Sequence, residues 1–487
     1  MMSNQALISG LKNIVGHSWV HDRASESAAP YLERFGFSPV CVVLPANTEE
    51  LETIIKSADK DGFSVWVLPN TAGNGGLVGS SDNDKAVVML DLSRMNQIID
   101  VDPDAAYALV EPGVSYQQLY DYLQDKHPNL WIDCDRNSQH SVAGSICARE
   151  YGYTFYGDHF FMQCGMEVML ADGNLVRTGM GSLPGNNTWQ LYKFGFGPYV
   201  DGLFTQSDLG IVTKIGLWLM PAPAAYQPFM VSLPRLEDLS MAVELMRPLK
   251  INMVVGNTVI ISSPAMDAAP YQRRSDYIEN GAVDEGALKG SLNLGQWNLY
   301  GAFYGSEKNV EAMWSTLEPA LKLIPGAKVF KRGERADDKV WQNREKMMRG
   351  VPVEGMDNIV NWQGDSVLSL SATAPLAGED SLKLQQMVSS ILSEHGFDYL
   401  CEYALAMRSM SKRINLPFDS RIDGSREQAE KCLYELATRL SNAGYGITHI
   451  STGYLPVALE GFKSGGLVDL QARLKDALDP KGILAAS

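Results

Sequence analysis

Gly152-Tyr153-Thr154-Phe155-Tyr156-Gly157-Asp158-His159 is the most informative segment of this 487-residue chain. Its adjacent aspartate and histidine, set among glycines and tyrosines, could supply an acid–base group from a loop. The pair also has an ordinary interpretation, because an aspartate beside a histidine often makes only local hydrogen bonds. The choice between a catalytic and a structural role for Asp158 and His159 therefore depends on the sequence on either side.

Regular secondary structure is predicted on both sides of this segment. Downstream, the apolar runs 166–170 and 175–178 flank Asp172-Gly173, which predicts a β-hairpin. Upstream, Asn47 and Ser115 are each followed three residues later by Glu50 and Gln118, the spacing of a capping box at a helix start. Strands are predicted at 63–68, 87–91 and 107–110. The N-terminal part should thus alternate strands and helices.

A glycine-rich turn, Pro69-Asn70-Thr71-Ala72-Gly73-Asn74-Gly75-Gly76, follows the first of these strands. Closely spaced glycines allow backbone N–H groups to approach phosphate oxygens, although the same residues also suit a plain tight turn. The spacing is not that of a Rossmann fingerprint, and a strand rather than a helix comes next. The sequence has no Walker A motif, HExxH motif or EF-hand loop, so no metal site is predicted.

The chain changes character after Pro221-Ala222-Pro223. Amphipathic helices are predicted at 241–249, 311–323 and 382–395, and strands at 254–262, 299–304 and 366–371. Two more helices with apolar faces are predicted at 427–443 and 469–478. This mixture indicates an antiparallel sheet backed by helices, so the predicted fold class is α+β.

An ordered series of segments resembles the family of vanillyl-alcohol oxidase, eugenol oxidase and para-cresol dehydrogenase. The series comprises 152–159, Gly165-Met166-Glu167-Val168, Arg177-Thr178-Gly179-Met180-Gly181, Lys193-Phe194-Gly195-Phe196-Gly197-Pro198-Tyr199, Asp201-Gly202-Leu203-Phe204-Thr205-Gln206-Ser207 and Gly210-Ile211-Val212-Thr213-Lys214. Glu111-Pro112-Gly113-Val114 and the glycine turn match upstream, and Asp479-Pro480-Lys481-Gly482-Ile483-Leu484 resembles the family's closing segment. The resemblance is weaker between residues 224 and 443.

The resemblance implies a two-part FAD-binding domain of the para-cresol methylhydroxylase (PCMH) type and an α+β cap domain with an antiparallel sheet. The expected parts are an FAD-binding domain at 1–223, a substrate or cap domain at 224–443, and a segment returning to the FAD domain at 444–487. The FAD pyrophosphate should lie against 69–76. The expected cofactor-binding residues are Pro69, Asn70, Thr71, Ala72, Gly73, Gly75, Gly76, Pro112, Gly113, Ser141, Gly144, Ser145, Tyr151, Gly157, Gly210, Ile211 and Val212.

The resemblance also implies a reaction. FAD carries the hydride chemistry, while the protein supplies position and electrostatics. The implied activity is an FAD-dependent oxidase or dehydrogenase that removes a hydride from an activated benzylic or allylic C–H bond or alcohol. Asp158 matches an aspartate that the family places beside the flavin, so it is the expected catalytic carboxylate.

The expected substrate pocket departs from the family pattern. Phenol-oxidising members hold the phenolate with two tyrosines and an arginine, which favour the ionised phenol. Here these positions carry Asn74, Thr448 and His449. We therefore expect a small, largely apolar substrate that is not held as a phenolate. His449 is either a catalytic group that contacts a substrate oxygen or a packing residue.

The flavin tether is also missing. Family members commonly attach FAD through a histidine or tyrosine of the cap, but the corresponding position here is Val367. None of the chain's seven histidines lies nearby, so noncovalent FAD is predicted. Cys134 is an alternative tether, because a related flavoprotein family places a cysteine in about the same region.

Two other functions stay open at this stage. The chain could be a non-catalytic subunit that pairs with a competent homologue, or an electron-transferring subunit of a heteromeric dehydrogenase. The electron acceptor could be dioxygen, a cytochrome or another redox partner. By analogy with the family, the expected assembly is a homodimer or a heteromer with a homologue.

Composition excludes several classes of protein. The net charge of -16 disfavours nucleic acid as a partner. No apolar run has the roughly 18 to 20 residues needed to cross a bilayer, and no signal peptide is recognised, so no membrane association is expected. The six cysteines include no CxxC pair and suggest no disulfide framework, which fits a reducing, cytoplasmic location.

Overall fold

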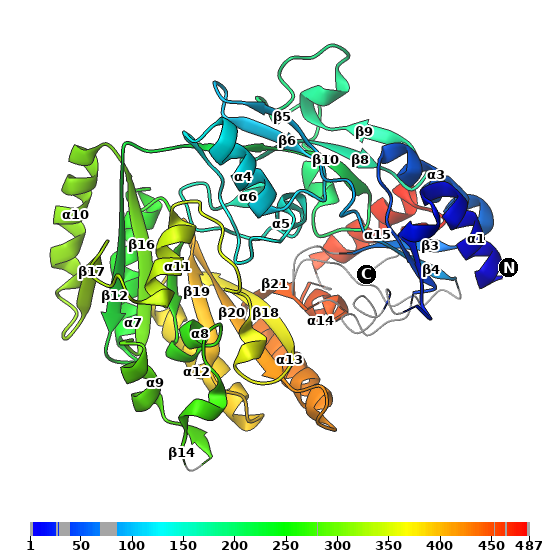
Figure 1. Ribbon diagram of the computed structural model, residues 1–487. Helices are drawn as coiled ribbons and strands as arrows, with labels where there is room; N and C mark the ends of the chain where they lie inside the picture. Colours follow the sequence, from blue (N-terminus) through cyan, green and yellow to red (C-terminus); the bar gives the residue numbers. More distant parts are fainter. Residues whose placement is uncertain are drawn as a thin grey trace.

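A computed structural model describes residues 3–25, 28, 39–68, 85–279, 281–451, 453–462 and 465–484. The N-terminal elements and the C-terminal helix form one body, and the central elements form a second body beside it (Figure 1). Both bodies combine helices with sheets, and the second is built on an eight-stranded antiparallel sheet. The predicted α+β class is confirmed.

The first body contains a small sheet in the order β1-β2-β4-β3, in which β2, β4 and β3 are parallel. The bounds are β1 Val20–Asp22, β2 Cys41–Val43, β3 Ser64–Val67 and β4 Val87–Leu90. Helices α1 (Asn4–Val15) and α3 (Thr48–Asp61) share one apolar core with this sheet. The end of the chain joins the sheet, because the Val65 N–H donates to the Ile483 carbonyl at 2.8 Å.

The predicted helix caps are present. The Asn47 side chain accepts from the Glu50 N–H at 2.9 Å and starts α3. The Glu50 carboxylate reaches back to the Ala46 N–H at 2.7 Å, one residue before the cap residue. Ser115 likewise caps α4 (Tyr116–Lys126) by accepting from the Gln118 N–H at 3.1 Å. Both local predictions are therefore confirmed.

A second sheet in this body has the order β5-β6-β10-β8-β9, and its neighbouring strands pair antiparallel. Its strands are β5 Ile98–Asp102, β6 Tyr107–Val110, β8 Gln163–Met169, β9 Leu175–Arg177 and β10 Ile211–Trp218. Strands β8 and β9 form the hairpin predicted around Asp172-Gly173. Helices α4, α5 (Val142–Cys147) and α6 (His159–Met162) lie beside this sheet (Figure 1). Short strands β7 (Leu130–Trp131) and β11 (Met220–Pro221) pair separately.

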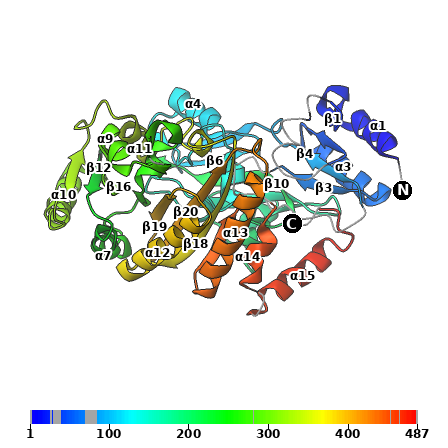
Figure 2. The same ribbon diagram turned by 90° about the horizontal axis from the view of Figure 1, so that it is seen from below.

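The second body is built on the sheet β17-β12-β16-β13-β19-β20-β18-β21. Its strands are β12 Ala225–Leu233, β13 Val259–Ser262, β16 Trp297–Gly305, β17 Lys328–Lys331, β18 Ser366–Pro375, β19 Leu400–Leu405, β20 Ser409–Phe418 and β21 Gly446–Ile450. One face packs against α7 (Asp238–Ile251), α10 (Glu307–Leu321), α12 (Gly378–Glu394) and α13 (Ser425–Asn442). Figure 2 shows α12 and α13 next to each other across this face.

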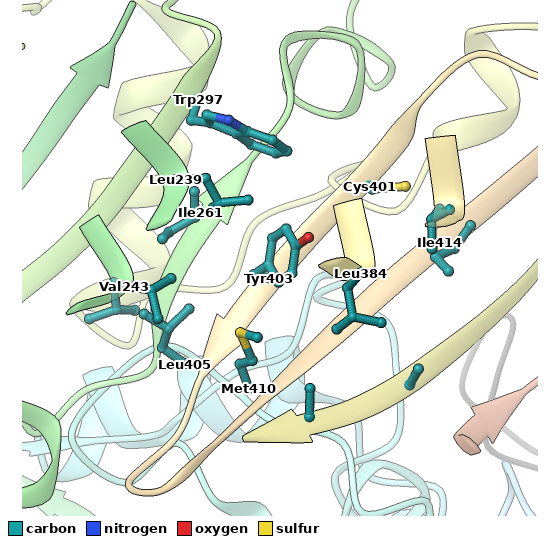
Figure 3. Packing of buried hydrophobic residues seen from close by; sticks show 14 of the residues in the cluster. Leu239, Val243, Ile261, Trp297, Leu384, Cys401, Tyr403, Leu405, Met410 and Ile414 are labelled. Carbon is teal, nitrogen blue, oxygen red and sulfur yellow. The ribbon is translucent and has the colours of Figure 1, made fainter. Parts of the chain in front are cut away.

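This helix-covered face holds the largest apolar core. Figure 3 shows Leu239 of α7 next to Ile261 of the sheet, and Leu384 of α12 beside Tyr403 and Met410. The predicted helices at 241–249, 311–323, 382–395 and 427–443 are confirmed, with ends shifted by a few residues. The remaining elements include α8 Pro264–Ala268, α9 Glu285–Ser291, α14 Leu455–Glu460 and α15 Leu467–Leu478.

The strand predicted at 254–262 is wrong over residues 254–258. The strand predicted from Val254 begins only at Val259. The Val254 and Val255 N–H groups instead donate to the Leu249 carbonyl and close the end of α7. Asn257 then makes a connection across the sheet, because its side-chain oxygen accepts from the Ala302 N–H at 3.1 Å. Apolar side chains here serve the helix end rather than an extended strand.

The opposite face of the large sheet is divided in two. Helix α11 (Lys339–Met348) covers the part near β12 and β16, where Trp341 stacks on Tyr300. On the other part, β19, β20 and β21 contact Tyr151, Glu150 and Ala148 of the first body. The 152–159 segment thus begins at the junction between the two bodies.

Candidate active site at the junction of the two bodies

Several predicted cofactor segments converge at one edge of the small parallel sheet. The Gly113 N–H donates to the Met95 carbonyl at 2.7 Å, which holds the 111–113 turn beside the chain that leaves β4. The Ser141 hydroxyl donates to the Pro112 carbonyl at 2.5 Å and accepts from the Gly144 N–H at 2.8 Å. Parallel strands bind ligands at their carboxyl ends. Because 69–76 directly follow β3, the described neighbours fit an FAD site at this edge.

The glycine turn itself, Pro69 to Gly76, lies outside the described residues, and so does Asn74. Among the described glycines of the prediction, close packing accounts for three, since a Cβ on Gly113 would lie 2.6 Å from the Ser93 carbonyl oxygen. A Cβ on Gly157 would lie 2.7 Å from the Thr258 hydroxyl, and one on Gly210 would lie 2.4 Å from a Val168 methyl group. Ile211 and Val212 begin β10 and are buried in two apolar cores.

His159 connects the 152–159 segment to helix α5. Its Nε2 lies 2.8 Å from Asp133 Oδ1, and its Nδ1 lies 3.0 Å from the Ser145 hydroxyl. Asp133 also accepts from the Thr154 N–H at 2.6 Å. Burial acts to lower the pKa of His159, but the hydrogen bond and charge of Asp133 outweigh it and raise that pKa. This buried pair fixes the loop that carries Asp158.

Asp158 is exposed and caps α6. Its Oδ1 accepts from the Phe161 N–H at 2.9 Å. Its backbone forms an isolated antiparallel bridge with Tyr151. The sequence left open whether this carboxylate is catalytic or structural, and the geometry gives it a definite structural contact. That contact occupies Oδ1, one of the two carboxylate oxygens.

Buried ion pairs join the two bodies next to this loop. Arg413 of β20 donates to Glu150 at 2.6 Å across the junction. Arg136 forms an ion pair with Glu402 of β19. Tyr151 donates to the same carboxylate at 3.3 Å. Paired charges of this kind are the form in which ionised side chains are tolerated inside proteins.

The Glu150 carboxylate of this cluster is held in its ionised form. Burial would raise the pKa of Glu150, but Arg413, then His449 and Arg136, lower it to about 2. Deeper in the second body, Arg344 lies 3.3 Å from Glu402 and 3.1 Å from Asp267. The ionic cluster thus extends from the first body across the sheet face.

A second contact across the junction involves His140. Its Nδ1 lies 2.9 Å from Asp135, and its Nε2 lies 3.4 Å from Asp357 of the second body. Burial acts to lower the pKa of His140, but the two carboxylates outweigh burial and raise that pKa to about 9. Asn137 also donates to Asp357 at 3.0 Å. This charged histidine links the bodies on the α11 side of the cluster.

The two described pocket positions, Thr448 and His449, lie on edge strand β21. His449 Nε2 is 3.0 Å from the Ala148 carbonyl, and its Nδ1 is 3.2 Å from the Thr448 hydroxyl. Because a carbonyl only accepts, Nε2 carries a hydrogen and donates it to Ala148. The structure therefore places His449 at the junction, where it makes a hydrogen bond to the first body.

Two features bear on flavin attachment. Val367 lies on β18, and its side chain packs with the apolar cluster around Trp362 and Leu400. Cys134, the alternative tether, is fully buried, and burial raises the pKa of its thiol. A buried thiol with a raised pKa forms little of the thiolate that covalent attachment through sulfur requires.

Sequence reasoning missed the ionic cluster of Arg136, Glu150, Glu402, Arg413 and Arg344. One signal for it was present, because Glu402 interrupts an otherwise largely apolar run in the predicted cap region. A charged residue inside a buried strand calls for a partner. No such signal gave the identity of that partner, since Arg413 and Glu150 are 263 residues apart.

Comparisons with known proteins agree with this arrangement. Residues 39–179 match a family described as FAD binding domain. The chain is 33% identical over 478 residues to the 4-cresol dehydrogenase [hydroxylating] flavoprotein subunit of Pseudomonas putida, covering 95% of this chain and 91% of the relative. The structure resembles p-cresol methylhydroxylase with substrate bound (TM-score 0.92, 31% identity, 98% of this chain and 95% of the other). It resembles equally a 4-ethylphenol oxidase from Gulosibacter chungangensis in complex with isoeugenol (TM-score 0.92, 29% identity, 98% and 95%).

Two kinds of feature are absent from the described part of the chain. None of its helices is long and apolar enough to span a membrane. Nor do its histidines, cysteines and carboxylates form a group of three or more that could hold a metal ion.

Proposed function

Because the chain belongs to the vanillyl-alcohol oxidase and para-cresol methylhydroxylase family of FAD-dependent oxidoreductases, we propose that it removes a hydride from a benzylic or allylic C–H bond or alcohol of a small, largely apolar substrate. The main support for this proposal is the arrangement of residues at the junction between the two bodies. The segment that leads into Asp158 lies against the polar face of the large sheet, directly beside the predicted FAD segments 141–145.

FAD, when bound, supplies the hydride acceptor. The chain's own residues supply the surroundings. The buried ion pairs of Arg413 with Glu150 and of Arg136 with Glu402 join the two bodies beside the loop that carries Asp158. Asp158 is proposed to accept the proton of the substrate hydroxyl as the C–H bond breaks. His449, whose Nε2 donates to the Ala148 carbonyl, is proposed to contact a substrate oxygen through Nδ1.

Asp158→Asn tests the catalytic proposal, because asparagine caps helices as well as aspartate does but cannot act as a base. We expect the variant to fold and bind FAD like the original protein. The anaerobic reduction of its flavin by a benzylic or allylic alcohol should be slower by roughly 10²- to 10⁴-fold. The measurement is the stopped-flow loss of oxidised-flavin absorbance. Equal rates in the two proteins would leave Asp158 with the structural cap alone, and a protein that no such alcohol reduces would refute the proposed reaction.

Noncovalent attachment of FAD is the second expected result. Val367 offers no nucleophile at the family's tether position, and Cys134 is buried as a thiol. Acid precipitation of the yellow protein should release all flavin into the supernatant. The precipitated chain should have the mass of the unmodified polypeptide. A flavin-bearing peptide after proteolysis would contradict this prediction.

A specific observation favours an electron-transferring subunit as the alternative function. The relative from Pseudomonas putida is named a flavoprotein subunit, which implies a partner subunit in that protein. The acceptor of this chain is therefore proposed to be either dioxygen or a redox protein such as a cytochrome. Reoxidation of the substrate-reduced flavin distinguishes them. Rapid reoxidation by air indicates an oxidase, whereas slow reoxidation by air and rapid reoxidation by cytochrome c indicates a dehydrogenase.

The proposal also covers the oligomeric state of the protein and its location in the cell. A homodimer or a heteromer with a homologue is expected by analogy with the family, as is a cytoplasmic location. Mass measurement of the purified protein by light scattering gives the oligomeric state directly.

A further inference from the structure

A row of polar side chains crosses all eight strands of the large sheet. Residues that are directly opposite each other on neighbouring strands point to the same face. Following the register from β17 to β21, the row is Lys328, Ser232, Asn298, Ser262, Glu402, Arg413, Ser371 and His449. Arg413 and His449 both contact the first body, so this row is on the face turned toward the junction.

Arg413 and Ser371 in this row have unused hydrogen-bonding capacity. Arg413 is 8% exposed, and its Nη2 donates to Glu150. Its Nε–H has no hydrogen-bond partner among the described residues, and neither does the Ser371 hydroxyl, although Ser371 is only 1% exposed. The two residues are opposite each other on adjacent strands, roughly 5 Å apart. Buried polar groups normally find partners, so this pair points to an acceptor atom supplied by a ligand.

The surface next to this pair is open and made of small residues. Next to the row of polar residues, on the same face of β19, β20, β18 and β21, four residues lie directly opposite one another on neighbouring strands. They are Ala404, Ser411, Thr373 and Gly446. Ser411, Thr373 and Gly446 are partly exposed, whereas Arg413 and Ser371 are buried. A small molecule could therefore approach the pair from this side without displacing large side chains.

The charge of Arg413 is already cancelled. Glu150 lies 2.6 Å from its guanidinium and is ionised, and the neighbouring Arg136 is paired with Glu402. An anionic group brought to Arg413 would meet the Glu150 carboxylate at the same guanidinium. A neutral acceptor such as a hydroxyl or carbonyl oxygen would not be repelled in this way.

We propose that the site binds its substrate as a neutral molecule, with an oxygen of that substrate accepting from Arg413 and Ser371, and that Glu150 rejects anionic substrates by compensating Arg413. The inference rests on the proposed function, because it names the charge state of the molecule that the enzyme oxidises. Glu150 and Arg413 are thereby specificity-determining residues.

Benzamide and benzoate test this proposal, because they have nearly the same shape and differ in charge. Their dissociation constants are measured by calorimetry on the FAD-loaded protein at neutral pH. The original protein should bind benzamide at least about tenfold more tightly than benzoate. In Glu150→Gln, the uncompensated Arg413 should improve benzoate binding relative to benzamide by about tenfold or more.

Two further variants keep the result interpretable. Glu167→Gln removes another buried carboxylate, paired with Lys214 and Arg177 in the first body, and should leave the benzamide-to-benzoate ratio unchanged. The double variant Glu150→Gln with Arg413→Gln has no unpaired charge and should lose the gained benzoate binding while binding benzamide more weakly than the original protein.

Three results would overturn the inference: equal binding of benzamide and benzoate by the original protein, an unchanged ratio in Glu150→Gln, or undiminished benzamide binding in the double variant. The reduction of FAD by benzyl alcohol is measured separately. A protein that is reduced but binds both probes equally refutes only this inference. A protein that discriminates between the probes but is never reduced refutes the proposed function.

Discussion

Gly152→Ala is expected to destabilise the FAD-binding body and to loosen its hold on the flavin. A Cβ on residue 152 would lie 1.3 Å from Asp133 Oδ1, 2.4 Å from Asp133 Cγ and 2.7 Å from His159 Nε2. The Asp133 carboxylate, which pairs with His159, therefore occupies the position that the Cβ of any other residue at 152 would take. A methyl group there forces the carboxylate away from His159 and from the Thr154 N–H.

The expected magnitude follows from the loss of a buried partner. Removing one partner of a buried ion pair costs about 3–5 kcal/mol, because the other partner is left uncompensated. For a body of about 200 residues, that cost corresponds to a fall in the unfolding midpoint of roughly 6–20 °C. Thermal unfolding followed by circular dichroism measures the fall, and flavin absorbance after desalting measures the retention of FAD.

Gly10→Ala is the matched control. Gly10 lies within α1, and a Cβ there would meet no atom within 4 Å. Alanine in a helix interior is favoured over glycine by roughly 0.5–1 kcal/mol, so this variant should be slightly stabilised. If Gly152→Ala unfolds at the same temperature as the original protein, the pair does not depend on this glycine.

Glu402→Gln is expected to weaken the second body and its junction with the first. Glu402 is fully buried and is the shared partner of Arg136, Arg344 and Tyr151. Glutamine keeps the volume and some hydrogen bonds but leaves two buried guanidinium groups with too little negative charge around them. The expected cost is about 3 kcal/mol, at the lower end for removal of one partner from a buried pair.

The effect is measured as a lower unfolding midpoint and as faster proteolysis between the bodies. Glu435→Gln serves as the control, because Glu435 makes similar contacts with His395 and Arg439 on the surface, where exposed ion pairs contribute little. Adding Arg136→Gln to Glu402→Gln should recover part of the loss by removing one uncompensated charge. Full stability of the single variant would show that the cluster tolerates an unbalanced charge.

Local signals account for what could be predicted of the fold. Asn47 and Ser115 identified two helix starts, and Asp172-Gly173 identified a hairpin, because each signal acts within a few residues. The prediction failed for 254–258, where the same apolar residues close a helix end and Asn257 bonds to Ala302. That outcome depends on a neighbouring strand, which a local pattern does not contain.

The sequence by itself determined the family, the α+β class and the expectation of FAD. It could do so because motifs such as 152–159 are short, contiguous segments that occur in a fixed order along the chain. It also led to the prediction that Asn74, Thr448 and His449 stand where the family's phenol-binding side chains are expected. Only the tertiary structure decided that Gly152 makes room for Asp133, that Asp158 caps a helix, and that Arg413 is compensated by Glu150. The reason is physical: these relationships are set by strand register and by contacts between the two bodies, which join residues far apart in the chain.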